Sequence, residues 1–338
     1  MRRVIVLGGL GLFGRSAAEQ LRKLGVHLRT ASRSVGADLQ MNANDPASIR
    51  SVVRHGNIVL DAAGPFHSRT LALIETAIEV GFDVVDLNDN LQYAESVVAL
   101  EPRIAEAGIC VLSSASTVSA FAAAVMKIIG PTAPRRITSF LAPVSRHTAN
   151  AGAALSLLRS VGQPIRILRD GKMQFACGWC ESRTASLPRP MGPIRGYLFE
   201  SADALYLPRI HPSLQDVAMY IDANVLGANT MLKMAAYSKV VRKVMQCGIG
   251  LGTWMARRFG SSTGGIAYEI EGEDRRIARF ALVAENNSYL VAIAPAVLAV
   301  QKIASDEFTE RGLVLPDRHA EPLEILRFLD SVGVKYVA

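Results

Sequence analysis

The sequence predicts an α/β protein in which a Rossmann doubly wound parallel sheet is followed by a second, α+β domain. Three observations support this fold class. A glycine-rich turn at residues 8–14 separates an apolar run from a helical pattern, short apolar runs alternate with helical patterns up to about residue 129, and the alternation stops after Pro131. Alternation of this kind is typical of parallel strands joined by crossover helices. The 338 residues are enough for about two domains.

The turn at residues 8–14 has the spacing of a dinucleotide-binding motif. The pattern G-x-G-x-x-G is matched by Gly9, Leu10, Gly11, Leu12, Phe13 and Gly14. In this motif the first glycine permits a tight turn, the second lets the backbone approach a pyrophosphate, and the third lets helix and strand pack closely. The pyrophosphate then lies on the helix N-terminus. The alternative is an ordinary strand–turn–helix unit with incidental glycines.

The end of the next apolar run distinguishes the two nicotinamide cofactors. Enzymes that use NAD place an acidic residue there for the ribose 2′-hydroxyl, whereas this sequence has Ser32, Arg33 and Ser34. The guanidinium offers several N–H donors to a phosphate and the serines add hydroxyls, so NADP is favoured over NAD. The alternative is a solvated loop arginine without a ligand.

Further strands and helices follow in alternation. We expect strands at residues 58–61, 84–86 and 110–112. We expect one helix that starts near Pro46 and three further helices over about 69–80, 91–107 and 118–129. Ligands of such sheets bind beyond the carboxyl ends of the strands. Asp86 ends one buried strand and can orient a neighbour, and the polar residues that follow it are expected to cap the next helix, as are those at 113–117.

The loop after residue 61 is a second candidate cofactor segment. Ala63 and Gly64 let the nicotinamide ribose lie close to the backbone, and Pro65 stiffens the turn. His67 is a candidate proton donor, since imidazole titrates near neutral pH. Its alternative role is to cap the following helix.

Taken together, these motifs resemble the NADP-binding domain of the saccharopine dehydrogenase-like reductases. They are G-G-x-G-x-F-G-R at residues 8–15, A-A-G-P-F at 62–66, V-D-L-N-D at 85–89 and S-S-A-S-T-V-S-A at 113–120. Shorter motifs in the second half, such as L-A-P at 141–143 and A-I-A-P-A at 292–296, resemble a bacterial branch of that family. The resemblance therefore extends over nearly the whole chain.

The resemblance implies three parts of the chain and a reaction. Residues 1–132 would form the NADP-binding Rossmann domain, 133–290 an α+β substrate and dimerisation domain, and 291–338 helices that return to the first domain. The implied enzyme is a dehydrogenase or reductase that transfers a hydride between NADP and a C=N or enoyl C=C bond of a small-molecule substrate, at the domain interface. We accordingly expect a homodimer.

The second half of the sequence agrees with an α+β domain. Residues 136–141 predict a strand, and residues 266–271 and 276–282 predict a hairpin with a short turn. Relatives carry a polar loop that faces the substrate where this chain has Arg146 and His147. Arg146 is a candidate carboxylate clamp and His147 a candidate acid, with an ordinary solvated loop as the alternative.

A basic segment without acidic residues covers residues 223–268. The whole chain has a net charge of +7, and this segment contributes Lys233, Lys239, Arg242, Lys243, Arg257 and Arg258. Its apolar middle at 244–256 includes Trp254 and is too short to span a bilayer. Such a segment suits peripheral contact with anionic lipid or with a lipid-like substrate. The alternative is a helix pair packed over the cleft or at the dimer interface.

The sequence disfavours one further partner and leaves two alternatives to the reductase. Nucleic acid is a poor partner, because aromatic residues are few and no recognition motif is present. A non-catalytic NADP-binding regulator is one alternative, since no residue is an unambiguous acid or base. A scaffold at the membrane surface is the other, because of the segment without acids.

The cysteines and the N-terminus indicate in which cellular compartment we expect the protein. An apolar strand starts at residue 4 and leaves no room for a signal peptide, so we expect a cytoplasmic protein, with the inner face of the membrane as a peripheral site. All four cysteines are then expected to be reduced thiols. Cys177 and Cys180 lack the strand–helix context of a redox pair and the further ligands of a zinc site, so no metal is expected.

Overall fold

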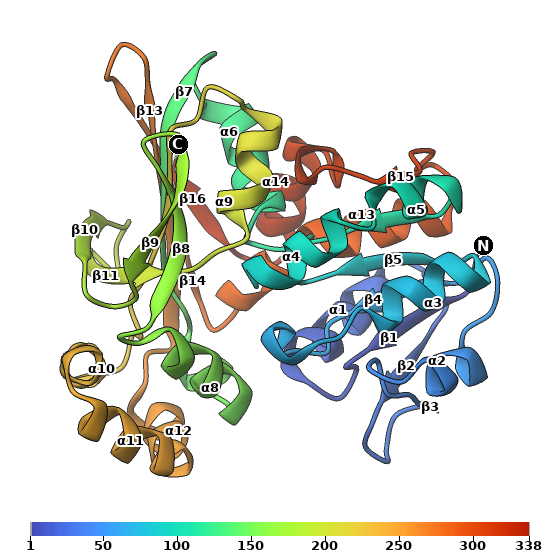
Figure 1. Ribbon diagram of the computed structural model, residues 1–338, viewed down its shortest axis with the longest axis horizontal. Helices are drawn as coiled ribbons and strands as arrows, with labels where there is room; N and C mark the ends of the chain where they lie inside the picture. The colour runs from blue at the N-terminus through green and yellow to red at the C-terminus, as the bar shows by residue number, and fades with distance from the viewer. Residues whose placement is uncertain (1, 338) are drawn as a thin grey trace. The chain divides into compact units, whose positions relative to one another are not determined.

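The computed structural model describes residues 2–337, which form two compact units (Figure 1). The first unit comprises Met1–Ala124 and Leu290–Phe328, and the second comprises Val125–Tyr289 and Leu329–Ala338. The C-terminal part of the chain therefore contributes to both units. Helices α6 (Ala120–Ile129) and α14 (Pro322–Ser331) and the short helix η2 (Ser288–Ala292) contain residues of both.

The first unit is built on a parallel sheet. Its strands are β1 (Val4–Leu7), β2 (Leu28–Ser32), β3 (Leu39–Gln40), β4 (Ile58–Asp61), β5 (Asp83–Asp86), β6 (Cys110–Leu112) and β15 (Gly312–Leu313). They lie in the order β15-β6-β5-β4-β1-β2-β3, and every neighbouring pair is parallel. From β3 to β6 this is the strand order of the Rossmann fold.

Helices cover both faces of this sheet. They are α1 (Leu12–Lys23), α2 (Pro46–Val52), η1 (Phe66–Ser68), α3 (Ala72–Val80), α4 (Leu91–Val98), α5 (Glu101–Glu106), α13 (Ala294–Ala304) and η3 (Pro316–Arg318). Every residue of β1, β4, β5 and β6 is buried, which is the pattern of strands covered on two sides. One core cluster joins Ile5, Val59 and Val84 to side chains of α2, α3 and α4. The predicted doubly wound α/β fold is confirmed.

One predicted helix is divided in two. The helix expected over about 91–107 is interrupted at residues 99–100, and α5 starts at Glu101 with Pro102 in its first turn. Proline has no N–H to donate to the preceding turn, but it is well suited to the first turn of a new helix. The sequence therefore continues as α5 instead of prolonging α4.

The second unit is built on a mixed sheet. Its strands are β7 (Pro134–Ala142), β8 (Pro164–Arg169), β9 (Lys172–Cys177), β10 (Ser182–Ser186), β11 (Pro193–Phe199), β12 (Asp216–Ile221), β13 (Thr263–Gly272), β14 (Ile277–Glu285) and β16 (Lys335–Val337). The main path is β10-β11-β12-β7-β13-β14-β16, with β8 paired to β12 and β9. Only β7 and β12 are parallel among these described pairs. The predicted strand at 136–141 and the predicted hairpin are present as β7, β13 and β14.

Helices of the second unit gather at one end of this sheet. They include α7 (Ser145–Thr148), α8 (Ala151–Ser160), α10 (Ala228–Tyr237), α11 (Lys239–Cys247) and α12 (Ile249–Phe259), while α9 (Asp203–Ile210) packs on β8 and β12 (Figure 1). The apolar stretch 244–256 is thus part of two consecutive helices. Among the described residues, no helix combines the length and the apolar character that crossing a bilayer requires.

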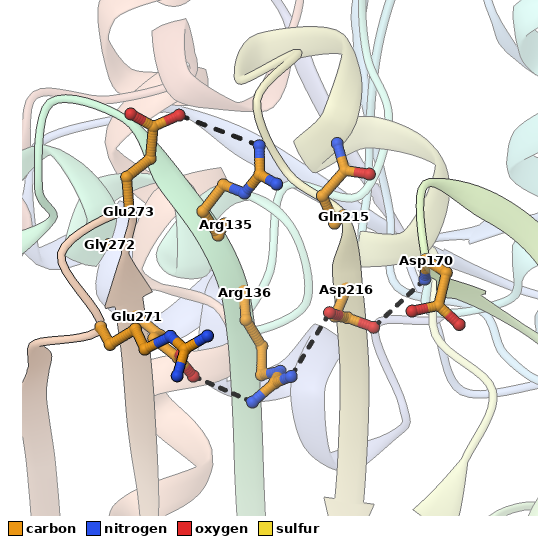
Figure 2. Close-up of a pocket in the computed structure, with 9 residues that line it drawn as sticks. Arg135, Arg136, Asp170, Gln215, Asp216, Glu271, Gly272 and Glu273 are labelled. Carbon is orange, nitrogen blue, oxygen red and sulfur yellow. Dashed lines mark hydrogen bonds and ion pairs between the residues drawn. The ribbon is translucent and has the colours of Figure 1, made fainter.

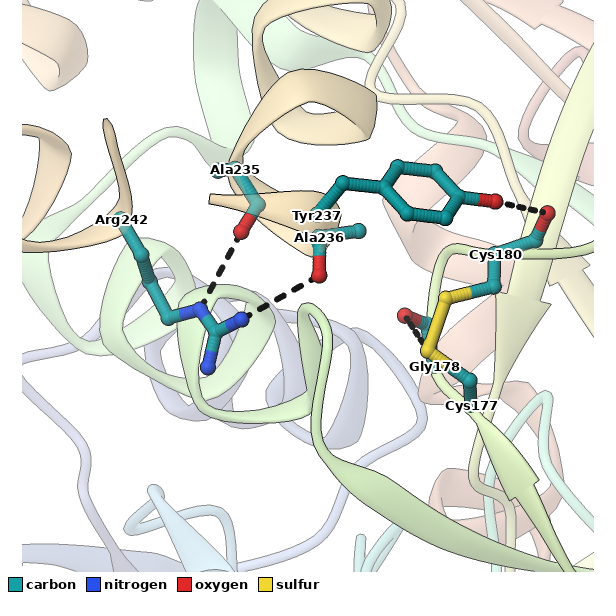
Figure 3. Close-up of a disulfide and its surroundings, with 7 residues drawn as sticks. All are labelled: Cys177, Gly178, Cys180, Ala235, Ala236, Tyr237 and Arg242. Atoms are coloured by element: carbon teal, nitrogen blue, oxygen red, sulfur yellow. Dashed lines mark hydrogen bonds between the residues drawn. A yellow bond between two sulfur atoms is a disulfide. The ribbon is translucent and has the colours of Figure 1, made fainter. Parts of the chain in front are cut away.

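The expectation of four reduced cysteines is wrong for one pair, because Cys177 and Cys180 form a disulfide (Figure 3). The turn between β9 and β10 explains the pairing. Trp179 in this turn has φ of 67° and is fully buried, stacked on Tyr197 with ring centroids 5.0 Å apart. The turn leaves the two cysteine Cα atoms 5.4 Å apart, within the range that a disulfide spans. Cys110 and Cys247 are free.

Alkylation of the native protein should separate the four cysteines into three classes. Cys247 is exposed and should react at once, whereas Cys110 should react only after unfolding, because burial raises the pKa of its thiol. Cys177 and Cys180 should react only after reduction. Mass spectrometry of peptides labelled before and after treatment with a reductant measures all three. Rapid labelling of Cys177 and Cys180 without reductant would contradict the disulfide.

Candidate functional site

The glycine turn and the loop after β4 meet at the point where the strand order reverses. β1 is hydrogen-bonded to β2 on one side and to β4 on the other. Gly8 has φ of 80°, and a Cβ atom there would lie 2.7 Å from the carbonyl oxygen of Ala62. Open α/β sheets bind their ligands at this switch point, beyond the carboxyl ends of the strands. The fold therefore brings two of the predicted cofactor segments together.

The glycines of the turn differ in what surrounds them. A Cβ atom at Gly9 would lie 2.6 Å from Cβ of Thr30, and one at Gly14 would lie 2.3 Å from the carbonyl oxygen of Gly8, so packing of the turn requires both glycines. At Gly11 the nearest atom would be the Gly8 oxygen at 3.2 Å, and no other heavy atom of the described structure lies within contact distance. The backbone at Gly11 is therefore open to a ligand.

The first turn of α1 completes this cradle. Gly11 is the N-cap residue of α1, and it has no side chain that could accept a hydrogen bond from the first turn. The N–H groups of that turn are therefore available to an anion. Leu12 and Phe13 are half-buried, while Leu10 is 36% exposed. Arg15 donates from Nη2 to the carbonyl oxygen of Leu10 at 3.0 Å, which holds a cation beside the turn. These groups fit a dinucleotide pyrophosphate.

The end of β2 and the segment after it offer hydrogen-bond donors, and the one acid there is held by Thr30. The Ser34 N–H donates to Oγ of Ser32 at 3.2 Å, which shapes the turn. The Arg33 side chain is exposed, and among the described residues its guanidinium has no hydrogen bond or ion pair. Asp38 follows in the chain, but its carboxylate accepts the N–H of Thr30 at 2.7 Å and the Thr30 hydroxyl at 2.9 Å. The backbone hydrogen bond, supported by the hydroxyl, lowers the pKa of Asp38.

The loop after β4 is fixed by a buried ion pair. Asp61 is fully buried at the end of β4, where it pairs with the Arg69 guanidinium, and its Oδ1 accepts the Ala63 N–H at 2.9 Å. Burial raises the pKa of Asp61, and the charge of Arg69 opposes this shift. The loop between the partners contains the cis Gly64–Pro65 peptide and the half-buried His67 of η1. A Cβ atom at Gly64 would meet no atom of the described structure within 4 Å.

Asp86 connects the loop after β5 to the loop after β6 through hydrogen bonds. Its Oδ1 accepts the N–H groups of Ser114 and Asn88 at 2.8 and 3.0 Å, and Nδ2 of Asn88 donates to Oγ of Ser114 at 3.2 Å. Asn90 caps α4, as predicted, by accepting the N–H of Tyr93. Burial, with a smaller contribution from the charge of Asp61, raises the pKa of Asp86 to about 7 against these hydrogen bonds. Oδ2 of Asp86 is buried and has no hydrogen-bond partner among the described residues.

The other two predicted catalytic residues lie in the second unit. Arg146 and His147 are exposed neighbours on α7. Nε of Arg146 donates to the carbonyl oxygen of Gly260 at 3.3 Å, and Nε2 of His147 lies 3.1 Å from Oδ1 of Asn286. The structure thus brings these two together on one turn, beside the end of α12. The catalytic roles of His67, Arg146 and His147 stay predictions.

The second unit also has a polar hollow of about 560 Å³ at one end of β7, β12 and β13 (Figure 2). Its charges neutralise one another. Arg136 lies 2.9 Å from the Glu271 carboxylate and 3.5 Å from that of Asp216, and Arg135 lies 3.8 Å from Glu273. These partly exposed pairs connect three strands, and we assign no ligand to them.

Some contacts of the candidate cofactor site were not predicted from the sequence. Gly8 and Arg15 belong to the motif at residues 8–15, but the sequence analysis gave neither of them a role. The pairs Thr30–Asp38 and Asp61–Arg69 join residues eight positions apart, a spacing that no regular pattern marks.

Replacement of Asp86 by Asn should remove a pH dependence of stability. The pKa of Asp86 is about 7 in the folded state and about 4 in an unfolded chain, so the native state binds the proton more tightly. The free energy of unfolding therefore falls as the pH rises through this window. Between about pH 5 and pH 8, wild type should lose about 2 to 3 kcal/mol relative to Asp86→Asn. The Asn amide keeps an acceptor for the Ser114 and Asn88 N–H groups.

Urea denaturation at several pH values measures this difference. Asp38→Asn is a suitable control, because the pKa of Asp38 is lowered and its contribution is complete above about pH 4. The cost of that substitution should therefore not change between about pH 5 and pH 8. Parallel profiles for wild type and Asp86→Asn would show that Asp86 titrates normally.

Comparison with known proteins identifies the first domain. Residues 4–112 match the model of the saccharopine dehydrogenase NADP binding domain. The fold of the chain is similar to that of apo saccharopine dehydrogenase (L-Glu forming) from Saccharomyces cerevisiae, with a TM-score of 0.62, 12% identity and 100% coverage of both chains. A mutant of meso-dapdh with DAP, from Clostridium tetani E88, has a TM-score of 0.43, 12% identity and 93% coverage of both chains.

A third similar structure is the WlbA (WbpB) dehydrogenase from Thermus thermophilus in complex with NAD and alpha-ketoglutarate. It has a TM-score of 0.42 and 10% identity, with 98% of this chain and 96% of that chain covered. No curated protein matches the chain in sequence. The domain match confirms the predicted resemblance to the saccharopine dehydrogenase-like NADP-binding family over residues 4–112. Over the whole chain, the structural comparison shows a shared fold.

Proposed function

We propose that this protein is an NADP-dependent oxidoreductase acting on a C=N or enoyl C=C bond of a small-molecule substrate. The observation that carries the proposal is the open backbone at Gly11, at the switch point of a Rossmann sheet within a matched NADP-binding domain. The bound cofactor supplies or accepts the hydride, and the protein orients it and handles the proton.

Each part of the cofactor has proposed partners in the first unit. The first-turn N–H groups of α1 bind the pyrophosphate, with Arg15 adding positive charge beside the turn. The nicotinamide ribose lies against Ala63, Gly64 and Pro65, where Gly64 leaves room for close approach.

The segment after β2 supports NADP over NAD. The acid that follows β2, Asp38, is held by Thr30, because its Oδ2 accepts hydrogen bonds from the Thr30 backbone N–H and hydroxyl. The Arg33 guanidinium, without a protein partner among the described residues, matches the charge and geometry of a 2′-phosphate. Ser32 and Ser34 supply hydroxyls beside it.

The proton and the substrate have three candidate partners. His67 is our candidate donor from the first unit, because η1 holds it on the loop that the Asp61–Arg69 pair fixes. In the second unit, Arg146 is a candidate clamp for a substrate carboxylate and His147 a candidate acid. We retain the prediction that the protein is a cytoplasmic homodimer.

Replacement of Arg33 by Ala should weaken NADPH binding about 10- to 100-fold and leave NADH binding nearly unchanged. The reason is that a charge-assisted hydrogen bond to the 2′-phosphate contributes about 1.5–3 kcal/mol, and NADH has no such phosphate. Fluorescence titration of both nucleotides measures the two affinities. Arg29→Ala is the matched control, since Arg29 is an exposed arginine near the start of β2, the strand that precedes Arg33.

Three further results would decide the wider proposal. Oxidation of NADPH at 340 nm on addition of imines or enoyl thioesters would show turnover, as the proposal expects. Equal affinity for NADH and NADPH would contradict the assignment of Arg33. Tight NADPH binding without turnover of any such compound would favour a non-catalytic regulator.

A further inference from the structure

An exposed apolar surface covers the outer side of α10, α11 and α12 in the second unit. We call it the α10–α12 face. Its members are large apolar side chains that are 43–97% exposed, namely Leu226, Met231, Met234, Tyr237, Val240, Val244, Leu251, Trp254, Met255 and Phe259. Neither α11 nor α12 has a buried residue. Exposed apolar side chains gathered in this way mark an interaction surface.

The face follows a helical periodicity. Gly248 caps both helices, because its N–H donates to the carbonyl oxygen of Val244 and its own carbonyl oxygen accepts the Gly252 N–H, both at 2.9 Å. Val240 and Val244 are one turn apart and share a side of α11, and Leu251 and Trp254 share a side of α12 in the same way. Another side carries Val241, Met245 and Ile249, which pack on the core cluster around Trp179.

Contacts to the rest of the second unit hold these helices in place. Arg242 donates from Nε to the carbonyl oxygen of Ala235 at 3.2 Å and from Nη2 to that of Ala236 at 3.3 Å, and so satisfies the end of α10 (Figure 3). The Tyr237 hydroxyl donates to the carbonyl oxygen of Cys180 at 3.4 Å. Nε of Arg257 donates to the carbonyl oxygen of Ala149 at 2.9 Å. The face is therefore presented by anchored helices.

The segment that carries the face has charges of one sign. Residues 223–268 contain six lysines and arginines and no acidic residue. Lys239 and Lys243 are exposed and immediately precede Val240 and Val244, so they border the apolar stripe along α11. The Arg258 guanidinium lies 5.5 Å from the ring centroid of Phe259. Apolar and aromatic side chains bordered by cations are the combination that binds an anionic membrane surface.

We propose that the α10–α12 face docks the protein on the surface of an anionic lipid bilayer, with Trp254 and its apolar neighbours entering the headgroup region. A second copy of the chain is a poorer occupant. A twofold contact presents the same surface from both subunits, so it would bring two sets of cations together without an acid to neutralise them. A bilayer with anionic headgroups supplies both the apolar phase and the missing charge.

Flotation of the full-length protein with lipid vesicles tests this proposal. Vesicles of phosphatidylcholine containing about a third phosphatidylglycerol should bind the protein, and pure phosphatidylcholine vesicles should bind it at least tenfold more weakly. Raising the salt concentration should weaken binding, because it screens exposed charges. Lys239→Gln together with Lys243→Gln should weaken binding to the anionic vesicles severalfold.

Leu251→Glu tests the apolar contribution and should reduce vesicle binding at least tenfold. Leu323→Glu is its matched control, because both leucines lie on helices and are 64% and 62% exposed. That control should bind like wild type. Tryptophan emission gives a readout on the unaltered protein. Of the two tryptophans, Trp179 is fully buried and Trp254 is 58% exposed, so a blue shift with anionic vesicles reports insertion of Trp254.

Three results would overturn the proposal. They are wild-type protein that does not float with anionic vesicles, binding that Leu251→Glu and Leu323→Glu alter equally, and Trp254 emission that anionic vesicles leave unchanged. Light scattering identifies the competing occupant. A dimer that Leu251→Glu converts to a monomer, without vesicle binding by wild type, would assign the face to a second copy. Vesicle binding needs no nucleotide, so this test is independent of the proposed reaction.

Discussion

Close backbone packing at the glycine turn is the constraint on which the candidate cofactor site depends. A side chain at Gly14 would overlap main-chain atoms of Gly8, and a side chain at Gly8 would overlap those of Ala62. Gly9 is held against Thr30 of the neighbouring strand. This packing sets where α1 begins and which of its N–H groups remain open. Gly11 alone of the motif's glycines is left almost without neighbours, so the turn is rigid on one side and open on the other.

Buried carboxylates stabilise the loops around that turn. Asp61 and Asp86 end adjacent strands and are direct partners in the β4–β5 register. Two ionised carboxylates so placed repel each other in an environment with little water. The positive charge of Arg69 stabilises the Asp61 carboxylate. Among the described residues, Asp86 has no such cation; it accepts hydrogen bonds, and its pKa is raised. The edge of the sheet at the candidate cofactor site is thus shaped by polar groups whose hydrogen bonds and ion pairs hold the loops in place.

The sequence predicts the first unit well where a pattern repeats along the chain. The strands at residues 58–61 and 110–112 have the predicted boundaries, since apolar runs buried on both faces are easily recognised. The split between α4 and α5 depends on one proline, and its effect on a strong helical pattern was not foreseen. The side chains that contact one another in space are not predicted in this way. Neither the Asp61–Arg69 pair nor the Thr30–Asp38 hydrogen bonds follow a periodicity, and the disulfide results from how Trp179 packs. These features appear only when tertiary contacts are known.

Hydrogen exchange with and without nucleotide tests the central claim most directly. If the turn after β1 holds a dinucleotide, NADPH should slow amide exchange at residues 12–14, where the open first-turn N–H groups would bind phosphate oxygens. NADPH should also slow exchange at residues 32–34, whereas NADH should slow exchange at residues 12–14 only. Unchanged exchange at residues 12–14 in nucleotide-saturated protein would contradict the account, because the pyrophosphate would then lie elsewhere.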